Sequence, residues 1–240
     1  PTTMNRIALV ALVGALALTA CDSGGPDTEI VNLEATVVTD LPADPTSGRD
    51  PETGVPFSNN LFTLYDLDAG EVVLSSDDTD DRSDSLGTAW DIGFRGTTII
   101  FNSGTSGPGT VQAQLLENTL FAELTTAPAD GYLQDGENTC PGAAFPGGTS
   151  AGSPYVICTG GGNGWYNYDS SQNLITPLSG RTVVLQTSEG NYAKVRILSY
   201  YQGNPNPPDP MAPTRYYTFE YVLQPDGTRD FETTEVEIED

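Results

Sequence analysis

Histidine is absent from all 240 residues of the chain. Serine–histidine–aspartate catalysis and histidine-ligated zinc both need an imidazole, so this sequence excludes both. Residues 148–152 match the G-x-S-x-G nucleophile string, but that motif requires a histidine base and a strand-to-helix turn. Here the string lies in a glycine- and proline-rich stretch, and we interpret the match as chance. We therefore predict no catalytic residue and expect a protein that is not an enzyme.

Positive charge is scarce as well. Lysine and arginine together number nine against 33 aspartates and glutamates, which gives a formal net charge of −24. A field of that sign repels phosphate backbones, so nucleic acid is excluded as a partner. Lys194 is the only lysine, and its place at an alternating position of a predicted strand indicates a surface charge.

The acidic residues have two explanations. Dense carboxylates with almost no lysine are typical of proteins adapted to high salt, where self-repulsion is screened over a few ångströms. The alternative is an acidic face with a function of its own. Salt adaptation predicts a lower melting temperature in millimolar than in molar salt, and an unchanged melting temperature would contradict it.

One acidic run is a candidate for binding a metal ion. Asp77–Asp84 could supply oxygen ligands to calcium, but it lacks the EF-hand spacing with its glycine at the sixth position. We interpret it as a solvated loop between strands. Asp66-Leu67-Asp68 before Gly70 is more typical of a hairpin turn than of a metal loop. We therefore predict no metal site.

Only one long hydrophobic run is present, Ile7–Ala17, and it is too short to span a bilayer. A basic start precedes it and Leu18-Thr19-Ala20-Cys21 follows, which is the pattern of a secretory signal ending in a bacterial lipobox. We predict a signal peptide over 1–20, a lipid on Cys21 that attaches the protein to the membrane, and a tether over 21–28. The expected location is the outer membrane, facing the periplasm or the cell surface. The alternative is an ordinary signal peptide whose Cys21 forms a disulfide.

Cysteine is rare, with three residues in the chain. Once Cys21 carries lipid, Cys140 and Cys158 remain, and an even pair in an oxidising compartment indicates a disulfide. The stretch between them is too rich in glycine and proline for regular structure, so the bond would order a long excursion. A metal–thiolate site is the alternative, but partner ligands are lacking.

The remaining pattern is β. Short apolar or alternating runs are separated by turn residues, with 26 glycines and 18 prolines in the chain. We predict a single all-β domain over 29–240, built of antiparallel strands and hairpins with long Gly/Pro-rich loops. Gln112–Thr125 is the best helix candidate, although Thr110–Leu116 also fits a strand. The predicted strands are 33–38, 61–65, 71–74, 88–95, 97–101, 110–116, 182–185, 192–198, 215–223 and 233–238.

Aromatic residues follow a glycine-rich loop at one place. Gly160–Gly164 leads directly into Trp165-Tyr166-Asn167-Tyr168. Trp165, Tyr166 and Tyr168 would suit contact with a sugar or a flat ring. The alternative is that these aromatic side chains anchor the loop on the core.

Four short sequence segments, which occur in the same order as in the HmuY family, resemble that family. Its members are lipid-anchored haem-binding proteins of Bacteroidetes-type bacteria. Behind a lipobox, the ordered set is fairly specific, and it spans residues 61–231. The segments are Trp90–Arg95, Asn102–Gly109, Tyr192–Ile197 with Tyr200-Tyr201, and Tyr217–Tyr221 followed by Asp226-Gly227.

The resemblance implies an all-β fold that holds haem in a cleft and passes it to a TonB-dependent outer-membrane receptor. The best-known member uses two histidines as axial ligands, which this chain lacks, and some relatives use methionines. Beyond the predicted signal only Met211 remains, in a proline-dense loop, and a thioether can ligate haem iron. The alternative is a methionine that fills a packing gap.

Three functions follow from these features. The first is an exported, lipid-anchored protein that captures haem at the cell surface for uptake, with Met211 as axial ligand. The second is a structural or adhesive surface lipoprotein of the same fold without haem. The third is a carbohydrate-binding or carbohydrate-active surface protein built on carboxylates and the aromatic residues 165–168.

Overall fold

The computed structural model describes residues 28–142, 144–145, 148–149 and 152–237. Within them the chain is almost all β, and every strand pairing is antiparallel, which confirms the predicted fold class. The predicted signal and Cys21 lie outside the described residues. No helix in this part of the chain is long and apolar enough to cross a membrane.

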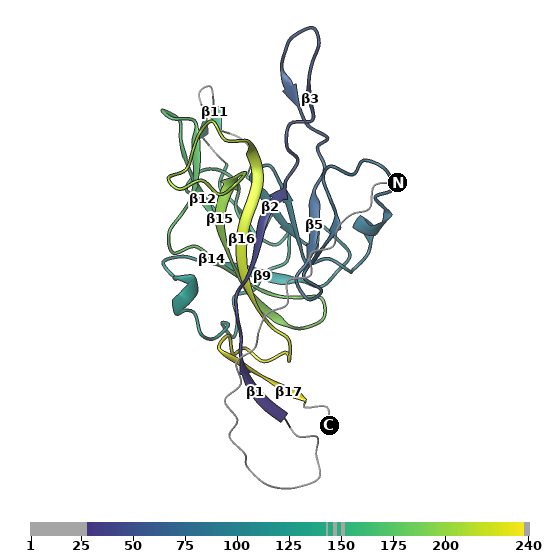
Figure 1. The fold of residues 1–240 in the computed structure, drawn as a ribbon, viewed down its shortest axis with the longest axis vertical. Coiled ribbons are helices and arrows are strands. Elements are labelled where there is room, and N and C mark those ends of the chain that lie inside the picture. Colours follow the sequence, from purple (N-terminus) through teal and green to yellow (C-terminus); the bar gives the residue numbers. More distant parts are fainter. Residues whose placement is uncertain (1–27, 143, 146–147, 150–151, 238–240) are drawn as a thin grey trace.

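Two sheets form the body of the molecule (Figure 1). The larger has the order β2-β16-β15-β14-β9, and the smaller has the order β6-β5-β7-β8. The strands of the larger sheet are β2 (Thr36–Pro42), β16 (Thr214–Gln224), β15 (Tyr192–Tyr201), β14 (Thr182–Gln186) and β9 (Gln112–Leu116). Those of the smaller sheet are β6 (Glu71–Leu74), β5 (Thr63–Asp66), β7 (Ile92–Arg95) and β8 (Thr98–Phe101).

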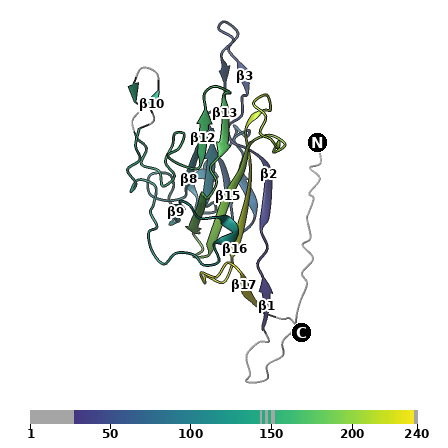
Figure 2. The same cartoon turned by 90° about the vertical axis from the view of Figure 1, so that its left-hand side faces the viewer.

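Short two-stranded ribbons extend from the body. Figures 1 and 2 place β3 at one end of the long axis and the β1–β17 pair at the other. The ribbons are β1 (Thr28–Asn32) with β17 (Thr233–Glu237), β3 (Gly48–Arg49) with β4 (Pro56–Phe57), β10 (Ala144–Phe145) with β11 (Gly148–Thr149), and β12 (Tyr166–Asp169) with β13 (Leu174–Pro177). Two short 3₁₀ turns, η1 (Ser83–Leu86) and η2 (Phe121–Glu123), complete the elements.

The main core lies between the two sheets, because the inward side chains of both are apolar and buried. Its centre is aromatic. The Phe219 ring of β16 stacks on Phe94 of β7 at 5.3 Å between centroids and meets Tyr65 of β5 edge-on at 5.5 Å. Phe219 and Phe94 are both 0% exposed. Strand alternation therefore places apolar side chains on facing surfaces, as the sequence pattern predicts.

The predicted helix over Gln112–Thr125 is wrong. Residues 112–116 form β9, which pairs with β14 and places Leu115 opposite Val183. The η2 turn follows, with Phe121 buried in a second apolar cluster on the outer face of the large sheet. The apolar residues of 112–125 have helical spacing. The hydrogen bonds between β9 and β14 and the burial of Phe121 stabilise the strand and turn instead.

The prediction of a surface charge at Lys194 is also wrong. The side chain is 6% exposed, and its Nζ donates to the carbonyls of Phe121 and Leu124 at 3.0 and 2.8 Å. It also lies 4.7 Å from the centre of the Phe121 ring. Lys194 therefore fixes the η2 turn against β15, a role that strand alternation alone does not reveal.

The predicted disulfide is confirmed. Cys140 and Cys158 are bonded, with 5.3 Å between their Cα atoms across 18 residues. Asn138 supports the junction, because its Nδ2 donates to the carbonyls of Tyr155 and Val156. The bond thus closes the excursion that contains β10 and β11.

Removing this bond should lower the stability of the protein. We expect a Cys140→Ser/Cys158→Ser double variant to lose about 3 kcal/mol of unfolding free energy, because the unfolded chain regains the freedom of the closed loop. Urea denaturation of wild type and variant measures the difference, and a reductant should affect the wild type alone. Equal stability of the two proteins would contradict the expectation.

Candidate functional site

A polar hollow of about 440 Å³ lies beside the turn that joins β7 to β8. Its lining comes from five separate parts of the chain, which the two sheets bring together, and we call it the arginine pocket. The lining residues are Asp44, Ser58, Asn60, Arg95, Gly96, Thr97, Thr98, Tyr200 and Arg215. The volume falls within the range of small-molecule sites.

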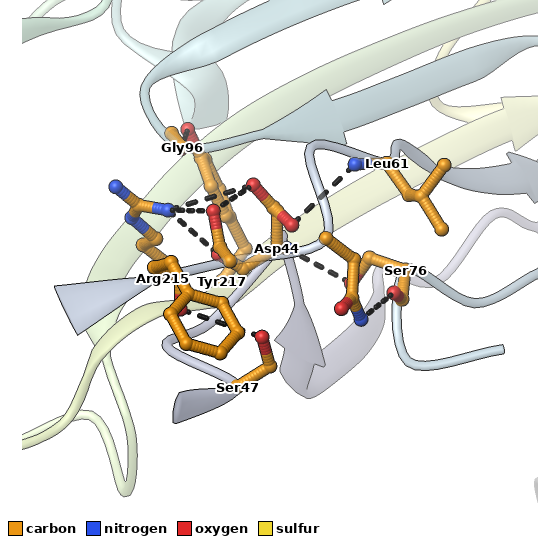
Figure 3. Close-up of polar contacts among 10 residues, drawn as sticks. Asp44, Ser47, Leu61, Ser76, Gly96, Arg215 and Tyr217 are labelled. Atoms are coloured by element: carbon orange, nitrogen blue, oxygen red, sulfur yellow. Dashed lines mark hydrogen bonds and ion pairs between the residues drawn. The ribbon is translucent and has the colours of Figure 1, made fainter. Parts of the chain in front are cut away.

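Arg215 is the most constrained cation in this pocket. Its Nη1 donates to the Asp44 carbonyl at 2.8 Å and to the Ser58 hydroxyl at 3.0 Å, and lies 3.5 Å from the Asp44 carboxylate. Ser58 donates to that carboxylate at 2.6 Å. Figure 3 shows the guanidinium facing Asp44, while Tyr217 reaches Gly96. These contacts all use Nη1, and the Arg215 side chain remains 35% exposed.

The backbone around the pocket is unusual. Asp44, Asn60 and Arg215 have φ angles of 63°, 59° and 66°. Asparagine and aspartate visit this left-handed region more readily than other residues, whereas arginine does so at a cost of about 1–2 kcal/mol. Such conformations persist where the surrounding contacts fix them, and they cluster at binding sites. The Arg215 carbonyl accepts from the Ala43 N–H at 2.8 Å, which holds this conformation in place.

Arg95 and Tyr200 complete the polar lining. The Arg95 guanidinium lies 4.3 Å from the centre of the Phe62 ring, a cation–π contact. Within the described residues Arg95 forms no hydrogen bond or ion pair through its side chain. Burial raises the pKa of the Tyr200 hydroxyl to about 12, and neighbouring Arg215 partly opposes that rise. Tyr200 is therefore a neutral hydrogen-bonding group at physiological pH.

The predicted aromatic contacts lie in two different environments. Trp165 and Tyr166 are buried at 2% and 6% exposure, whereas Tyr168 is 47% exposed. The Trp165 indole donates to the Thr97 carbonyl at 3.0 Å, and Tyr217 donates to the Gly96 carbonyl at 2.9 Å. Trp165 thus anchors its loop on the core and supports the pocket turn from beneath. Of the three aromatic residues, Tyr168 alone offers an exposed ring.

Met211 lies on the connector between β15 and β16, which spans residues 202–213. The connector leaves the larger sheet after Tyr201 and returns just before Arg215. Tyr200 and Arg215, which flank it, both line the pocket. Both views place it at the same end of the molecule as β3 (Figures 1 and 2). The Met211 side chain is 87% exposed, so it fills no packing gap in the core.

A second group of side chains gathers at the turn after β5. The carboxylates of Asp66, Asp68 and Asp91 lie within 4.8 Å of one another. Each already accepts a protein hydrogen bond: Asp66 from the Ala69 N–H, Asp68 from the Asn191 amide, and Asp91 from the Leu67 N–H. The turn itself is the predicted hairpin between β5 and β6. Each of the three carboxylates therefore has a hydrogen-bond partner within the protein.

Asp91 gives the protein an expected pH dependence. Burial raises its pKa from 3.8 to about 7, and the carboxylates of Asp68 and Asp66 add to the rise. The folded state therefore binds the proton more tightly than the unfolded state, so stability falls as pH rises from about 4 towards 7. We expect a loss of about 2 kcal/mol between pH 5 and pH 8 from this residue.

Urea denaturation across that pH range measures the effect. The loss should be much smaller in Asp91→Asn than in the wild type. Carboxylates whose pKa is lowered, such as Asp50 and Asp169, act in the opposite direction and only below about pH 4. An exposed-site control, Asp130→Asn, should keep the wild-type slope, and equal slopes for all three proteins would contradict the assignment.

The predicted acidic loop between strands is present at 77–84, and one arginine fixes it. Arg82 donates to the carbonyls of Ser75, Asp78 and Phe62. All five acidic residues in the loop are exposed. Of the 148–152 string, Gly148–Thr149 forms β11, and Ser150 lies outside the described residues.

Comparison with known proteins gives a family match. The model of the HmuY protein family matches residues 58–221, which is more than half of the chain. Among curated proteins, none matches the sequence.

Several solved structures are similar. An apo HmuY analog from Tannerella forsythia shares 16% identity over 82% of this chain and 98% of its own, with a TM-score of 0.41. A Bacteroides vulgatus protein, described in provisional terms as HmuY-like and heme-binding, shares 15% over 81% and 91%, with a TM-score of 0.42. Apo PinO from Porphyromonas gingivitis shares 16% over 80% and 96%, with a TM-score of 0.40. At these identities and TM-scores the matches assign no ligand and no residue to this chain.

Proposed function

The chain belongs to the HmuY family, and on that premise we propose that it is an exported, lipid-anchored protein that captures haem at the cell surface for uptake. The family match over residues 58–221 is the observation that carries this proposal. The activity is binding without catalysis. The partners are the membrane, through lipid on Cys21, and a TonB-dependent outer-membrane receptor that takes over the haem.

The iron ligand in this proposal is Met211. No histidine is available, and Cys140 and Cys158 are joined to each other, so their sulfurs are not free. The Met211 thioether is exposed on a connector that is flanked by two residues of the arginine pocket, Tyr200 and Arg215. A loop-borne methionine can ligate haem iron. Tyr168, with its exposed ring, is the aromatic residue best placed for contact with a flat ligand.

Haemin titration of the purified mature protein tests the capture of haem. We expect a shifted Soret band in the wild type and its loss or alteration in Met211→Leu, which keeps the apolar bulk without sulfur. Leu86→Ala, another exposed apolar site at 78% exposure, is the control and should keep the full spectrum. No Soret shift in either redox state would overturn the haem proposal, and a full spectrum in Met211→Leu would overturn the ligand assignment alone.

The lipid anchor has a separate test. We expect the wild type expressed in its native export pathway to fractionate with membranes, and Cys21→Ser to appear in the soluble fraction. The reason is that the acyl chains supply the attachment, since a surface of this negative charge does not bind anionic headgroups. Membrane fractionation of the Cys21→Ser protein equal to wild type would contradict lipidation at this residue.

A further inference from the structure

Positive charge is scarce in this protein. Apart from Arg6 in the predicted signal, the chain contains eight lysines and arginines, and two of them, Arg95 and Arg215, line one hollow. A net charge of −24 repels an anionic ligand at long range. A ligand that carries carboxylates therefore needs a local cationic site to bind.

The charges within the pocket leave a positive surplus. Arg215 is paired with Asp44, whose side chain is only 4% exposed and already accepts from Ser58. Arg95 has no such partner among the described residues, and its guanidinium lies over the Phe62 ring. The pocket lining therefore contains two guanidinium groups and one carboxylate group.

The geometry also suits an anion. Arg215 contacts Asp44 and Ser58 through Nη1, and its side chain remains 35% exposed. The neutral Tyr200 hydroxyl and the hydroxyls of Thr97 and Thr98 add donors around the same hollow. Because Tyr217 and Trp165 hold the turn at Gly96-Thr97, these donors are placed before a ligand arrives.

We propose that the arginine pocket is a carboxylate-binding site, in which Arg95 and Arg215 receive one carboxylate group of the captured ligand. A guanidinium presents two parallel N–H donors that match a carboxylate, and such charge-assisted pairs are the strong ones. Under the proposed function, on which this part rests, the carboxylate is a haem propionate. A free small carboxylate is the other source of the same chemistry.

Paired titrations of the mature protein test this site. The first ligands are haemin and its dimethyl ester, which lacks free carboxylates, in the same detergent. The second pair of ligands is glutarate and inorganic phosphate, and their binding is followed through the arginine Nε–H signals in nuclear magnetic resonance spectra. The variants are Arg95→Gln, Arg95→Lys and the control Arg229→Gln, an exposed arginine that does not line the pocket.

We expect Arg95→Gln to weaken haemin binding about 10- to 100-fold, the range for loss of a charge-assisted pair. Arg95→Lys should lie between that variant and wild type, and Arg229→Gln should change the affinity by less than about twofold, because screening limits its reach. The ester should bind the wild type at least as weakly as haemin binds Arg95→Gln, because it loses the charged contact with Arg215 as well. Since the Arg95 side chain forms no hydrogen bond within the described residues, its replacement should leave the circular dichroism spectrum unchanged.

The outcomes separate the two proposals. Equal affinity for haemin and its ester, with no effect of Arg95→Gln, would overturn the carboxylate site and leave haem capture standing. Absence of haemin binding, together with glutarate-dependent shifts of Arg95 and Arg215 signals, would overturn haem capture and support the pocket as a site for a small carboxylate. Shifts with phosphate but not glutarate, or with neither, would overturn the carboxylate site.

Discussion

Replacing Asp135 by alanine is expected to destabilise the protein by about 3–5 kcal/mol. Asp135 is 1% exposed, and its two carboxylate oxygens accept from the N–H groups of Phe101 and Val156, both at 2.8 Å. One contact is on β8 and the other is in the disulfide-closed excursion, so a single side chain joins the two. A hydrogen bond to a charged group contributes about 1.5–3 kcal/mol, and the alanine variant leaves both donors buried and unpaired.

Urea denaturation at neutral pH measures the loss. Asp135→Asn keeps one acceptor oxygen and should fall between alanine and wild type, because its amide nitrogen faces an N–H donor. Asp130→Ala, at an exposed site in the same segment, should stay within about 0.5 kcal/mol of wild type. An Asp135→Ala protein as stable as Asp130→Ala would contradict this role of Asp135.

Phe219→Ala is expected to cost a similar amount, about 3–5 kcal/mol, because it leaves a cavity between the sheets. The ring is 0% exposed and contacts Phe94 and Tyr65 on the smaller sheet and Tyr221 on its own strand. Its loss removes the aromatic contacts by which β16 packs on β5 and β7.

The matched control is Phe57→Ala, on the β3–β4 ribbon. That ring is 53% exposed, so its removal should change the unfolding free energy by less than about 0.5 kcal/mol. Equal losses for the two phenylalanine variants, measured by urea denaturation, would contradict the placement of the core between the sheets.

Much of the sheet structure follows from local pattern. The run Glu71–Leu74 is β6 with the predicted bounds, and the alternation around Tyr217, Phe219 and Tyr221 marks β16. These strands have one apolar face and lie between turn residues, so period-2 alternation identifies them. By contrast, β12 and β13 were not predicted, because a glycine-rich loop precedes them and most of their residues are only partly buried, without a clear buried face.

The helix over Gln112–Thr125 and the surface position of Lys194 failed for a different reason. In both cases the structure depends on residues that are far away in the sequence. β14 pairs with residues 112–116. The carbonyls of Phe121 and Leu124 accept hydrogen bonds from the Lys194 ammonium group. Pattern within a short window carries no information about such partners.

The arginine pocket was missed altogether. Its lining runs from Asp44 to Arg215, and these two residues, 171 positions apart, meet only in the folded sheets. The scarcity of lysine and arginine is the feature of the sequence that could have pointed to this site, because each arginine in so acidic a chain is a candidate for binding an anion. Even so, the sequence does not reveal that Arg95 and Arg215 line one hollow, because that depends on the packing of two sheets.

The account places the ligand at the end of the molecule that holds the arginine pocket and the Met211 connector. Hydrogen–deuterium exchange of the mature protein with and without haemin tests this most directly. We predict slower exchange in the β7–β8 turn at residues 95–98 and in the connector 202–213, with no change in β1 and β17 at the opposite end. Protection confined to β1 and β17, or to the turn at Asp66–Gly70, would contradict the proposed site.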